Sequence, residues 1–421
     1  MSRFSYTKIF LLGFGFFGVS VVWGVYNAFV PIFLAERFHL APAVIGFFMT
    51  LDNIAALFIQ PPVGAWSDRL RTPLGRRLPF LLIGAPISAI AFGLIPLAAA
   101  LPFFVACTST LLLSMAFWRT PVVALMPDIT PSQYRSQANG IVNFMGGVGA
   151  ILSFLAGGAL YRLNPSYPFW MGSALVILAL LLVLFFIREP EEIEASEHQP
   201  GMLESLCEVM RDKDKSALRL FLAIFFWFLG FTAIEAFFTL YAKNHLGLHE
   251  ADGSRLLGHL SLFFVLFALV SGFMGGKFGR RRTISLGLLL LVGVISTIYF
   301  FPPAVLTQTL GKLPVLGTIP VLSLLLMLAG IGWALININS LPMVVDLTSA
   351  SRIGTYTGLY YLFSTLSAIA GPNVNGLAIQ LMNRNYNVIM LLAPFFMLVA
   401  LWLMWGVRRG EAKVMKAAYA R

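Results

Sequence analysis

The chain has 421 residues, of which 58% are hydrophobic and only 11% are charged, and its net charge is +11. A soluble domain carries roughly 25% charged residues, so this composition excludes an ordinary water-soluble protein and indicates a membrane protein. The positive charge does not indicate nucleic-acid binding, because the basic residues lie in short loops between apolar segments.

Apolar segments long enough to cross a bilayer follow one another along the whole chain. A spanning helix needs about 20 mostly apolar residues, and only helices or closed barrels satisfy the backbone hydrogen bonds in lipid. These segments lack the alternating pattern of strands, so we predict an all-α membrane protein with twelve transmembrane helices in two six-helix bundles. The predicted helices cover residues 9–34, 43–65, 79–100, 102–127, 137–160, 168–187, 218–242, 257–276, 283–302, 318–345, 355–381 and 387–407.

One long hydrophilic segment divides these helices into two groups of six. We predict an N-terminal bundle over residues 1–187, a cytoplasmic linker over 188–217, and a C-terminal bundle with a short cytoplasmic tail over 218–421. Most Lys and Arg residues fall on the side of the termini and the linker, which places both termini in the cytoplasm and the protein in the cell membrane. The loops of the other side receive Arg37, Arg162, Lys243, Arg255, Lys312 and Arg384.

The two predicted halves repeat the same loop motifs. Residues 64–77, after the second helix, and residues 275–282, after the eighth, are both short, glycine-containing and basic. Residues 128–135 and 346–352, after the fourth and tenth helices, both begin with Asp and end with Arg. Such repeats are typical of alternating-access transporters. We predict a cytoplasmic gate whose salt bridges join the halves in the outward-open state. The alternative is that these charged residues only keep the loops solvated. The predicted gate residues are Asp68, Arg69, Arg76, Arg77, Asp128, Arg135, Asp346 and Arg352.

The loop at residues 64–77 resembles the signature of the major facilitator superfamily. Residues 60–80 and 121–128 are similar to the proton-coupled sucrose transporters and their relatives among the glycoside:cation symporters. The resemblance implies the major facilitator fold and proton-coupled uptake of a disaccharide or glucoside through a central cavity. Plant sucrose transporters carry an aspartate and an arginine where this chain has Leu112 and Val123, so their proton carrier is not transferred to this chain.

Three charged residues lie well inside predicted helices: Asp52 in the second, Arg119 in the fourth and Glu235 in the seventh. Charges in lipid are costly and usually face the bundle interior or a water-filled cavity. We predict that Asp52 and Glu235 couple transport to a cation, because a dry cavity favours a protonated carboxyl and a nearby cation favours the ionised form. Arg119 is predicted to bind the solute. The alternative to these roles is a structural ion pair that holds two helices together. For Asp52, a position at the external mouth is a further alternative.

Amide and aromatic side chains in the predicted helices are suited to a neutral sugar. Asn337 and Asn339 point about 200° apart on a helix, so they cannot both face one cavity. For the aromatic residues, the lipid interface is the alternative location. Besides Arg119, the predicted solute-binding residues are Tyr26, Asn27, Asn53, Gln60, Asn143, Trp333, Asn337, Asn339, Tyr360 and Asn373.

These features together predict a secondary transporter rather than an enzyme. It carries a small polar solute, such as a sugar or glycoside, in step with a cation, which the resemblance implies is a proton. We predict a monomer in the lipid bilayer, with no cofactor, no metal site and no nucleic-acid partner, since the sequence lacks a phosphate-binding loop and metal-spaced histidines. The alternatives are an antiporter that exports a small organic compound and, more remotely, a non-transporting membrane sensor.

Overall fold

The computed structural model describes residues 6–130, 135–187, 189, 206, 209–211, 214–314, 316–348 and 352–410. Most of the predicted linker lies outside these residues. The N-terminal half contains α1 (Tyr6–Ile32) with the π-helical turn η1 (Phe33–Arg37), α2 (Pro42–Phe48), α3 (Leu51–Arg69), α4 (Leu78–Leu94) with the 3₁₀ turn η2 (Ile95–Leu97), α5 (Leu101–Ile129), α6 (Arg135–Leu163) and α7 (Tyr167–Phe186).

The C-terminal half contains α9 (Ser216–Asn244), α10 (Glu250–Phe278), α11 (Arg280–Phe300), the short α12 (Pro303–Leu306), α13 (Val321–Val345), α14 (Ile353–Leu381) and α15 (Val388–Trp405). Between α12 and α13 lies an antiparallel hairpin of β1 (Thr309–Leu313) and β2 (Gly317–Pro320), which the sequence analysis did not predict. The helix predicted from residue 318 therefore begins at Val321.

Eleven segments of the described chain are long and apolar enough to cross a membrane. The broken pair of α2 and α3 forms one of them. The twelfth long helix is α14, which has 29 residues. It is more polar than the others because it carries Asn373, Asn375 and several Ser and Thr residues. The predicted all-α membrane fold is thus confirmed.

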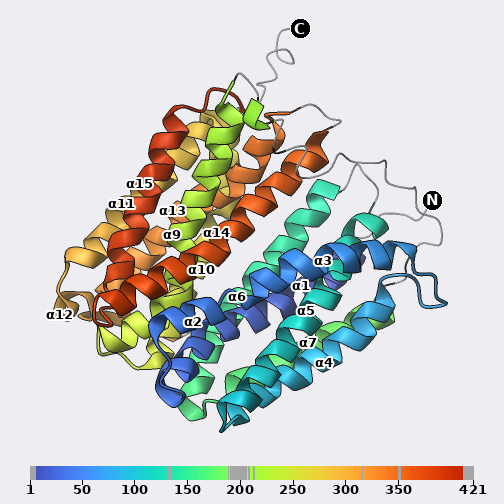
Figure 1. Cartoon of the computed structure of the whole chain (residues 1–421), viewed down its shortest axis with the longest axis horizontal. Coiled ribbons are helices and arrows are strands. Elements are labelled where there is room, and N and C mark those ends of the chain that lie inside the picture. Colours follow the sequence, from blue (N-terminus) through green and yellow to red (C-terminus); the bar gives the residue numbers. More distant parts are fainter. Residues whose placement is uncertain are drawn as a thin grey trace.

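Each half packs its helices in the same pattern (Figure 1). In the N-terminal half, α1 packs on α6 and α7, while α4 packs on α5 and α7. In the C-terminal half, α9 packs on α14 and α15, while α11 packs on α13 and α15. These pairs are equivalent when the helices of each half are counted from its first span, so the fold is built from two structural repeats.

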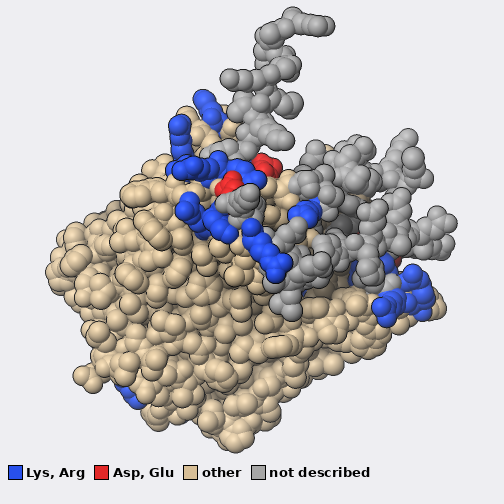
Figure 2. Space-filling view, turned by 45° about the horizontal axis from the view of Figure 1, so that its top comes forward, with Lys and Arg blue, Asp and Glu red and all other residues tan. Residues whose placement is uncertain are grey.

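The two ends of the bundle differ in charge. Figure 2 shows Lys and Arg side chains gathered over one end, where α1 begins and α15 finishes. We call this the basic end. It includes the loop between α3 and α4 and the loop between α10 and α11.

The halves meet at the end opposite the basic end, which we call the closed end. Here α6 packs on α10, α2 on α14 and α1 on α9. A Cβ added to Gly46 would lie 2.3 Å from the Pro372 carbonyl oxygen of the other half, and one added to Gly158 would lie 2.7 Å from the Ala251 carbonyl oxygen. Toward the basic end of α6 and α14, no atom of the described residues lies within 4 Å of a Cβ added to Gly140 or to Gly358. The halves therefore separate toward the basic end.

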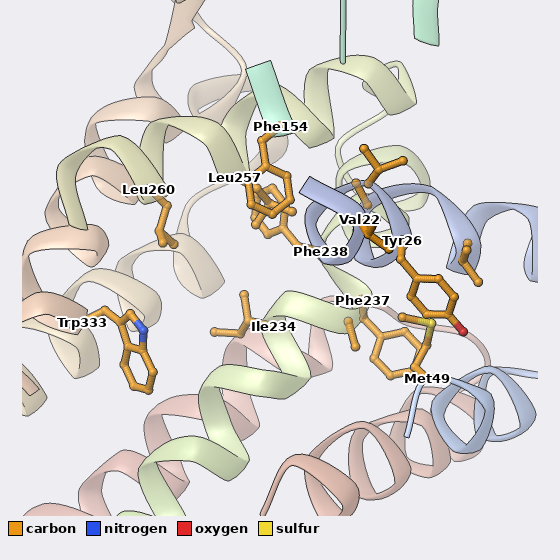
Figure 3. Close-up of a cluster of buried hydrophobic side chains, with 14 of the residues drawn as sticks. Val22, Tyr26, Met49, Phe154, Ile234, Phe237, Phe238, Leu257, Leu260 and Trp333 are labelled. Carbon is orange, nitrogen blue, oxygen red and sulfur yellow. The ribbon is translucent and has the colours of Figure 1, made fainter. Parts of the chain in front are cut away.

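Apolar side chains from both halves fill the contact near the closed end. They belong to one continuous core, part of which Figure 3 draws. These side chains seal one end of the space between the halves. We call them the apolar plug: Val22, Tyr26, Met49 and Phe154 from the N-terminal half, with Phe237, Phe238 and Leu257 from the C-terminal half.

Candidate functional site

The break between α2 and α3 places Asp52 inside the bundle. The chain leaves helical geometry after Phe48, and α3 begins at Leu51, so Asp52 lies in the first helical turn. Unpaired backbone N–H groups at a helix start favour a negative side chain there. The side-chain amide of Asn53 donates to Asp52 Oδ1 at 2.8 Å. Asp52 is thus held at the point where the spanning segment is interrupted.

Glu235 enters the same region from the C-terminal half. It lies on α9, and the Asn27 side-chain amide on α1 donates to its Oε1 at 3.3 Å. Asp52 and Glu235 are close enough to interact electrostatically. The Asn27–Glu235 bond therefore joins the two halves beside both carboxyl groups.

Arg119, on α5, is the third intramembrane charge. Asp52 of its own half and Tyr361 on α14 of the other half both lie within electrostatic range of it. Its side chain is exposed although it lies within a spanning helix, and Tyr361 is 57% exposed. Both side chains lie in the helix segments nearer the basic end, where the halves separate. Arg119 therefore faces space between the halves, whereas the two carboxyl groups lie nearer the plug.

Several predicted polar residues surround this charge cluster. The Asn373 side-chain amide donates to Thr50 Oγ1 at 3.2 Å, which connects α14 to the break before α3. The Tyr26 side chain is 1% exposed, and its hydroxyl has no hydrogen-bond partner within the described chain. The following predicted residues are partly or fully exposed on α3, α6 and α13: Asn53, Gln60, Asn143 and Asn337.

Three predicted residues pack inside the C-terminal half instead. The Asn339 amide is 3% exposed and donates to the Ser271 hydroxyl at 3.0 Å, which joins α13 to α10. The Tyr360 hydroxyl lies 3.1 Å from Ser340 Oγ. The Trp333 ring stacks on Phe231 with a centroid distance of 3.7 Å. Their polar groups or ring faces are engaged by neighbours, so we leave Asn339, Tyr360 and Trp333 out of the candidate site.

Tyr361, which follows the predicted residue Tyr360, is 57% exposed, whereas Tyr360 is buried. Consecutive helix residues point about 100° apart, so of two adjacent tyrosines only one can face the opening. The sequence contained both, but hydropathy alone does not fix the rotation of α14.

The predicted gate residues at the basic end form ion pairs within each half. Arg76 lies 2.8 Å and Arg77 lies 3.0 Å from the Asp128 carboxylate, and all three belong to the N-terminal half. Arg280 pairs with Asp346 within the C-terminal half. The salt bridges predicted between the halves belong to the outward-open conformation and remain a prediction. Arg69 and Arg352 are exposed. The side chains of Asp68 and Arg135 lie outside the described residues.

Glu189 holds the loop after α3 in place. Its carboxylate accepts backbone N–H bonds from Arg76, Arg77 and Leu78 at 2.7–2.8 Å. Gly75 has φ +106, and a Cβ there would lie 2.6 Å from the Glu189 carboxyl carbon. The turn therefore requires glycine, and the pairs of Asp128 form on a fixed loop.

Ion pairs between halves lie at the closed end, where none had been predicted. Arg162 of α6 pairs with Asp252 of α10. Lys243 of α9 lies 2.8 Å from Glu36 of η1 and 2.6 Å from Glu250 of its own half. The basic partners, Arg162 and Lys243, had been considered only as topology signals.

Comparison with known proteins places this architecture in a family. The model described as "Major Facilitator Superfamily" matches residues 12–372 and 220–419. The chain belongs to this superfamily. Its fold resembles a bacterial homolog of the human lysosomal transporter Spinster in the inward-facing and occupied conformation, with a TM-score of 0.74, 15% identity, and coverage of 95% of this chain and 96% of that one. The nucleoside transporter NupG gives a TM-score of 0.71 at 15% identity, covering 96% and 100% of the two chains.

Curated superfamily relatives include two kinds of transport protein. "Multidrug resistance protein 2" of Bacillus subtilis (strain 168) is 25% identical over 404 residues, which is 94% of each chain. "Sucrose transport protein SUC3" of Arabidopsis thaliana is 22% identical over 237 residues, covering 48% of this chain and 40% of that protein. The superfamily prediction is confirmed, and the sucrose-transporter resemblance extends over about half of the chain.

Proposed function

We propose that this superfamily member is a secondary transporter that moves a small polar organic solute together with a cation, a proton, by alternating access. The observation that carries the proposal is the convergence of Asp52, Arg119 and Glu235, which come from both halves, beside the contact between the halves. Ionisable groups in a membrane interior are expensive and mark solute or ion pathways. Repeated halves with a site between them supply the rocking motion.

The proposed orientation places the basic end in the cytoplasm, by the excess of Lys and Arg there. The described conformation is then inward-open. The apolar plug and the Lys243–Glu36 and Arg162–Asp252 pairs close the external end. In the outward-open state these contacts separate and the basic ends of the halves approach each other.

The proposed coupling acts through the Asn27–Glu235 hydrogen bond. Protonation removes the charge of Glu235 and weakens its ability to accept from the Asn27 amide. A cation that binds one state better than the other shifts the equilibrium between them. Proton binding at Glu235 therefore changes the stability of a contact that joins the halves.

The solute is proposed to be a sugar or glycoside, because the interior offers amides in addition to charges. Asn53, Gln60, Asn143 and Asn337 supply donors and acceptors suited to hydroxyl groups. A cavity selective for lipophilic compounds would instead present mainly Phe and Met side chains.

Reconstituted protein tests this function. Proteoliposomes loaded with a panel of disaccharides and glucosides should exchange at least one labelled solute by counterflow. An outward solute gradient should also carry protons out of the liposomes. Counterflow of no solute in the panel, together with no proton movement, would reject the proposal.

Export by antiport is the second candidate, because similarity to "Multidrug resistance protein 2" extends over 94% of both chains. The direction of proton movement separates the candidates. A symporter moves protons in the same direction as the solute, and an antiporter moves them in the opposite direction. The same liposomes with an internal pH dye measure this direction.

A further inference from the structure

The C-terminal end of α15 lies between two arginines of neighbouring helices. Arg219 on α9 donates to the Gly406 carbonyl oxygen at 2.8 Å, and Arg281 on α11 donates to the Trp405 carbonyl oxygen at 3.0 Å. Positive side chains are favourable at a helix C-terminus, where the last carbonyl groups lack partners within the helix. A Cβ added to Gly406 would lie 2.5 Å from the Arg219 guanidinium, so glycine permits this close approach. Both guanidinium groups are therefore held beside the same helix end.

A third arginine joins this position just after α15 has ended. The backbone N–H of Arg408 donates to Ser216 Oγ at 3.0 Å, in the first turn of α9. Ser216 and Arg219 lie three residues apart, so they share one face of that helix. Arg219 and Arg408 are exposed, and Arg281 is partly exposed. We call Arg219, Arg281 and Arg408 the arginine cluster.

Carboxylates balance other basic side chains of this region. Arg280 pairs with Asp346, and Arg409 pairs with Asp214. In contrast, no carboxylate of the described residues pairs with either exposed arginine of the cluster. Side chains of one charge held close together repel one another and attract counter-ions. The arginine cluster is therefore suited to an anion that the described chain does not supply.

The equivalent place in the N-terminal half contains an acidic residue instead. There α7 packs on α1 and α4, as α15 packs on α9 and α11. The third residue after the last residue of α7, Phe186, is Glu189, and its carboxylate accepts backbone N–H bonds from residues 76–78. The third residue after the last residue of α15, Trp405, is Arg408. One repeat thus carries its own anionic group at this place, and the other carries a further cation.

Two exposed tryptophans indicate the depth of the arginine cluster in the membrane. Trp402 is 67% exposed and Trp405 is 66% exposed, and their spacing of three residues places them on one face of α15. Tryptophans of membrane proteins are enriched at the level of the lipid headgroups. Arg281 binds the backbone carbonyl of Trp405 itself, so the cluster lies at this level and belongs to the basic end shown in Figure 2.

We infer that the arginine cluster binds the phosphate group of an anionic phospholipid, whose acyl chains lie along Trp402 and Trp405. Guanidinium groups match phosphate oxygens through paired N–H···O bonds, and basic sites between helices on the cytoplasmic side suit lipid headgroups. A zwitterionic lipid brings a positive group that the arginines repel, whereas phosphatidylglycerol has a net negative charge. The bound lipid joins α9, α11 and α15 and stabilises the C-terminal half. Only the choice of the cytoplasmic leaflet rests on the proposed orientation.

Lipid nanodiscs that contain the full-length protein test the inference. Discs of phosphatidylcholine alone are compared with discs of phosphatidylcholine and phosphatidylglycerol in equal parts. Phosphatidylglycerol should raise the midpoint of thermal unfolding, because a ligand that binds only the folded state stabilises it. Native mass spectrometry of protein released from the mixed discs should show retained phosphatidylglycerol. Inorganic phosphate added to the phosphatidylcholine discs should not raise the midpoint, because it lacks acyl chains.

Removal of one positive side chain should weaken phosphatidylglycerol binding about fivefold. Arg408→Gln is the most informative variant, because this side chain makes no hydrogen bond or ion pair within the described residues. Arg219→Gln also loses the bond to the Gly406 carbonyl group, and Arg219→Lys should keep part of the affinity. Arg71→Gln is the matched control, because Arg71 is an exposed residue of the N-terminal half at the same end. This variant should bind phosphatidylglycerol as the unaltered protein does.

Several results would overturn the inference. Equal unfolding midpoints in the two kinds of disc would do so, and this result is expected if acidic residues of the chain itself, such as those at 191–197, neutralise the arginine cluster. An affinity unchanged in both Arg408→Gln and Arg219→Gln would also reject the site. Equal weakening by Arg71→Gln would show a general attraction of anionic lipid to the basic end. An equal increase in the midpoint with inorganic phosphate would reject the lipid as the ligand.

Discussion

The two ends of the bundle use ion pairs in different ways. At the basic end, Arg76 and Arg77 both pair with Asp128 within a single half. At the closed end, Arg162 and Lys243 reach carboxylates of the opposite half. The first arrangement ties helices together within a half, and the second joins the two halves at the end that is shut. Pairs within a half should therefore control stability, whereas contacts between halves should control conformation.

Removing the Asp128 carboxylate should have the largest effect on stability. Its side chain is 11% exposed, and those of Arg76 and Arg77 are 12% and 5% exposed. Asp128→Ala leaves two buried guanidinium groups without this partner, which should lower the free energy of unfolding by about 3–5 kcal/mol. Thermal unfolding in detergent measures the loss. Asp346→Ala is the comparison, and it should cost less because the Arg280–Asp346 pair is more exposed. Equal losses would contradict the difference in burial.

Glycine substitutions should change the conformation with smaller energies. Gly46→Val places a side chain against the Pro372 carbonyl group at the closed end, and such overpacking costs about 1–3 kcal/mol. The variant should favour the outward-open state by about ten- to a hundredfold. Gly140→Val enters open space in the described state and should instead hinder closure of the basic end. Spin-label distances across each end measure both shifts. Identical shifts in the two variants would show that opening of one end is not coupled to closing of the other.

The ion pairs at the closed end should give the smallest effect, because they are partly exposed. Arg162→Gln removes the pair with Asp252, whose side chains are 43% and 29% exposed. A loss of about 0.2–1 kcal/mol is expected, which increases opening of this end a few-fold. Arg409→Gln breaks a pair with Asp214 at the basic end, which joins the segment before α9 to the segment after α15 and does not join the two halves, so it should leave the conformation unchanged. A conformational shift in Arg409→Gln as large as that in Arg162→Gln would contradict the assignment.

Hydropathy predicted the helices well because lipid penalises every polar interruption. Their ends agree with the structure to within a few residues, apart from α10, which begins at Glu250 rather than 257. The break at Met49–Thr50 was not predicted, since no glycine or proline marks it in the sequence. The β1–β2 hairpin was missed because both strands are short and the exposed β1 lacks an apolar pattern.

The intramembrane charges were the strongest indication of the site in the sequence. Asp52, Arg119 and Glu235 were selected because lipid makes isolated charges costly, and the structure brings them into one electrostatic cluster. Amide and aromatic side chains were harder to place, because the sequence does not show which partner an amide binds. The Asn339 amide donates to Ser271 within one half, whereas the Asn27 amide donates to Glu235 of the other half. The closed-end pairs join residues as distant as 162 and 252, and such pairing follows only from the packing of α6 on α10.

Carboxyl groups beside the contact between the halves are proposed to couple a cation to solute movement. Proteoliposomes containing Glu235→Gln test this coupling most directly, because the amide retains the shape of the side chain and cannot titrate. Asp214→Asn, outside the spanning helices, is the control. Glu235→Gln should still catalyse solute counterflow but should no longer accumulate solute when a proton gradient is applied. Accumulation equal to that of the unaltered protein would contradict it.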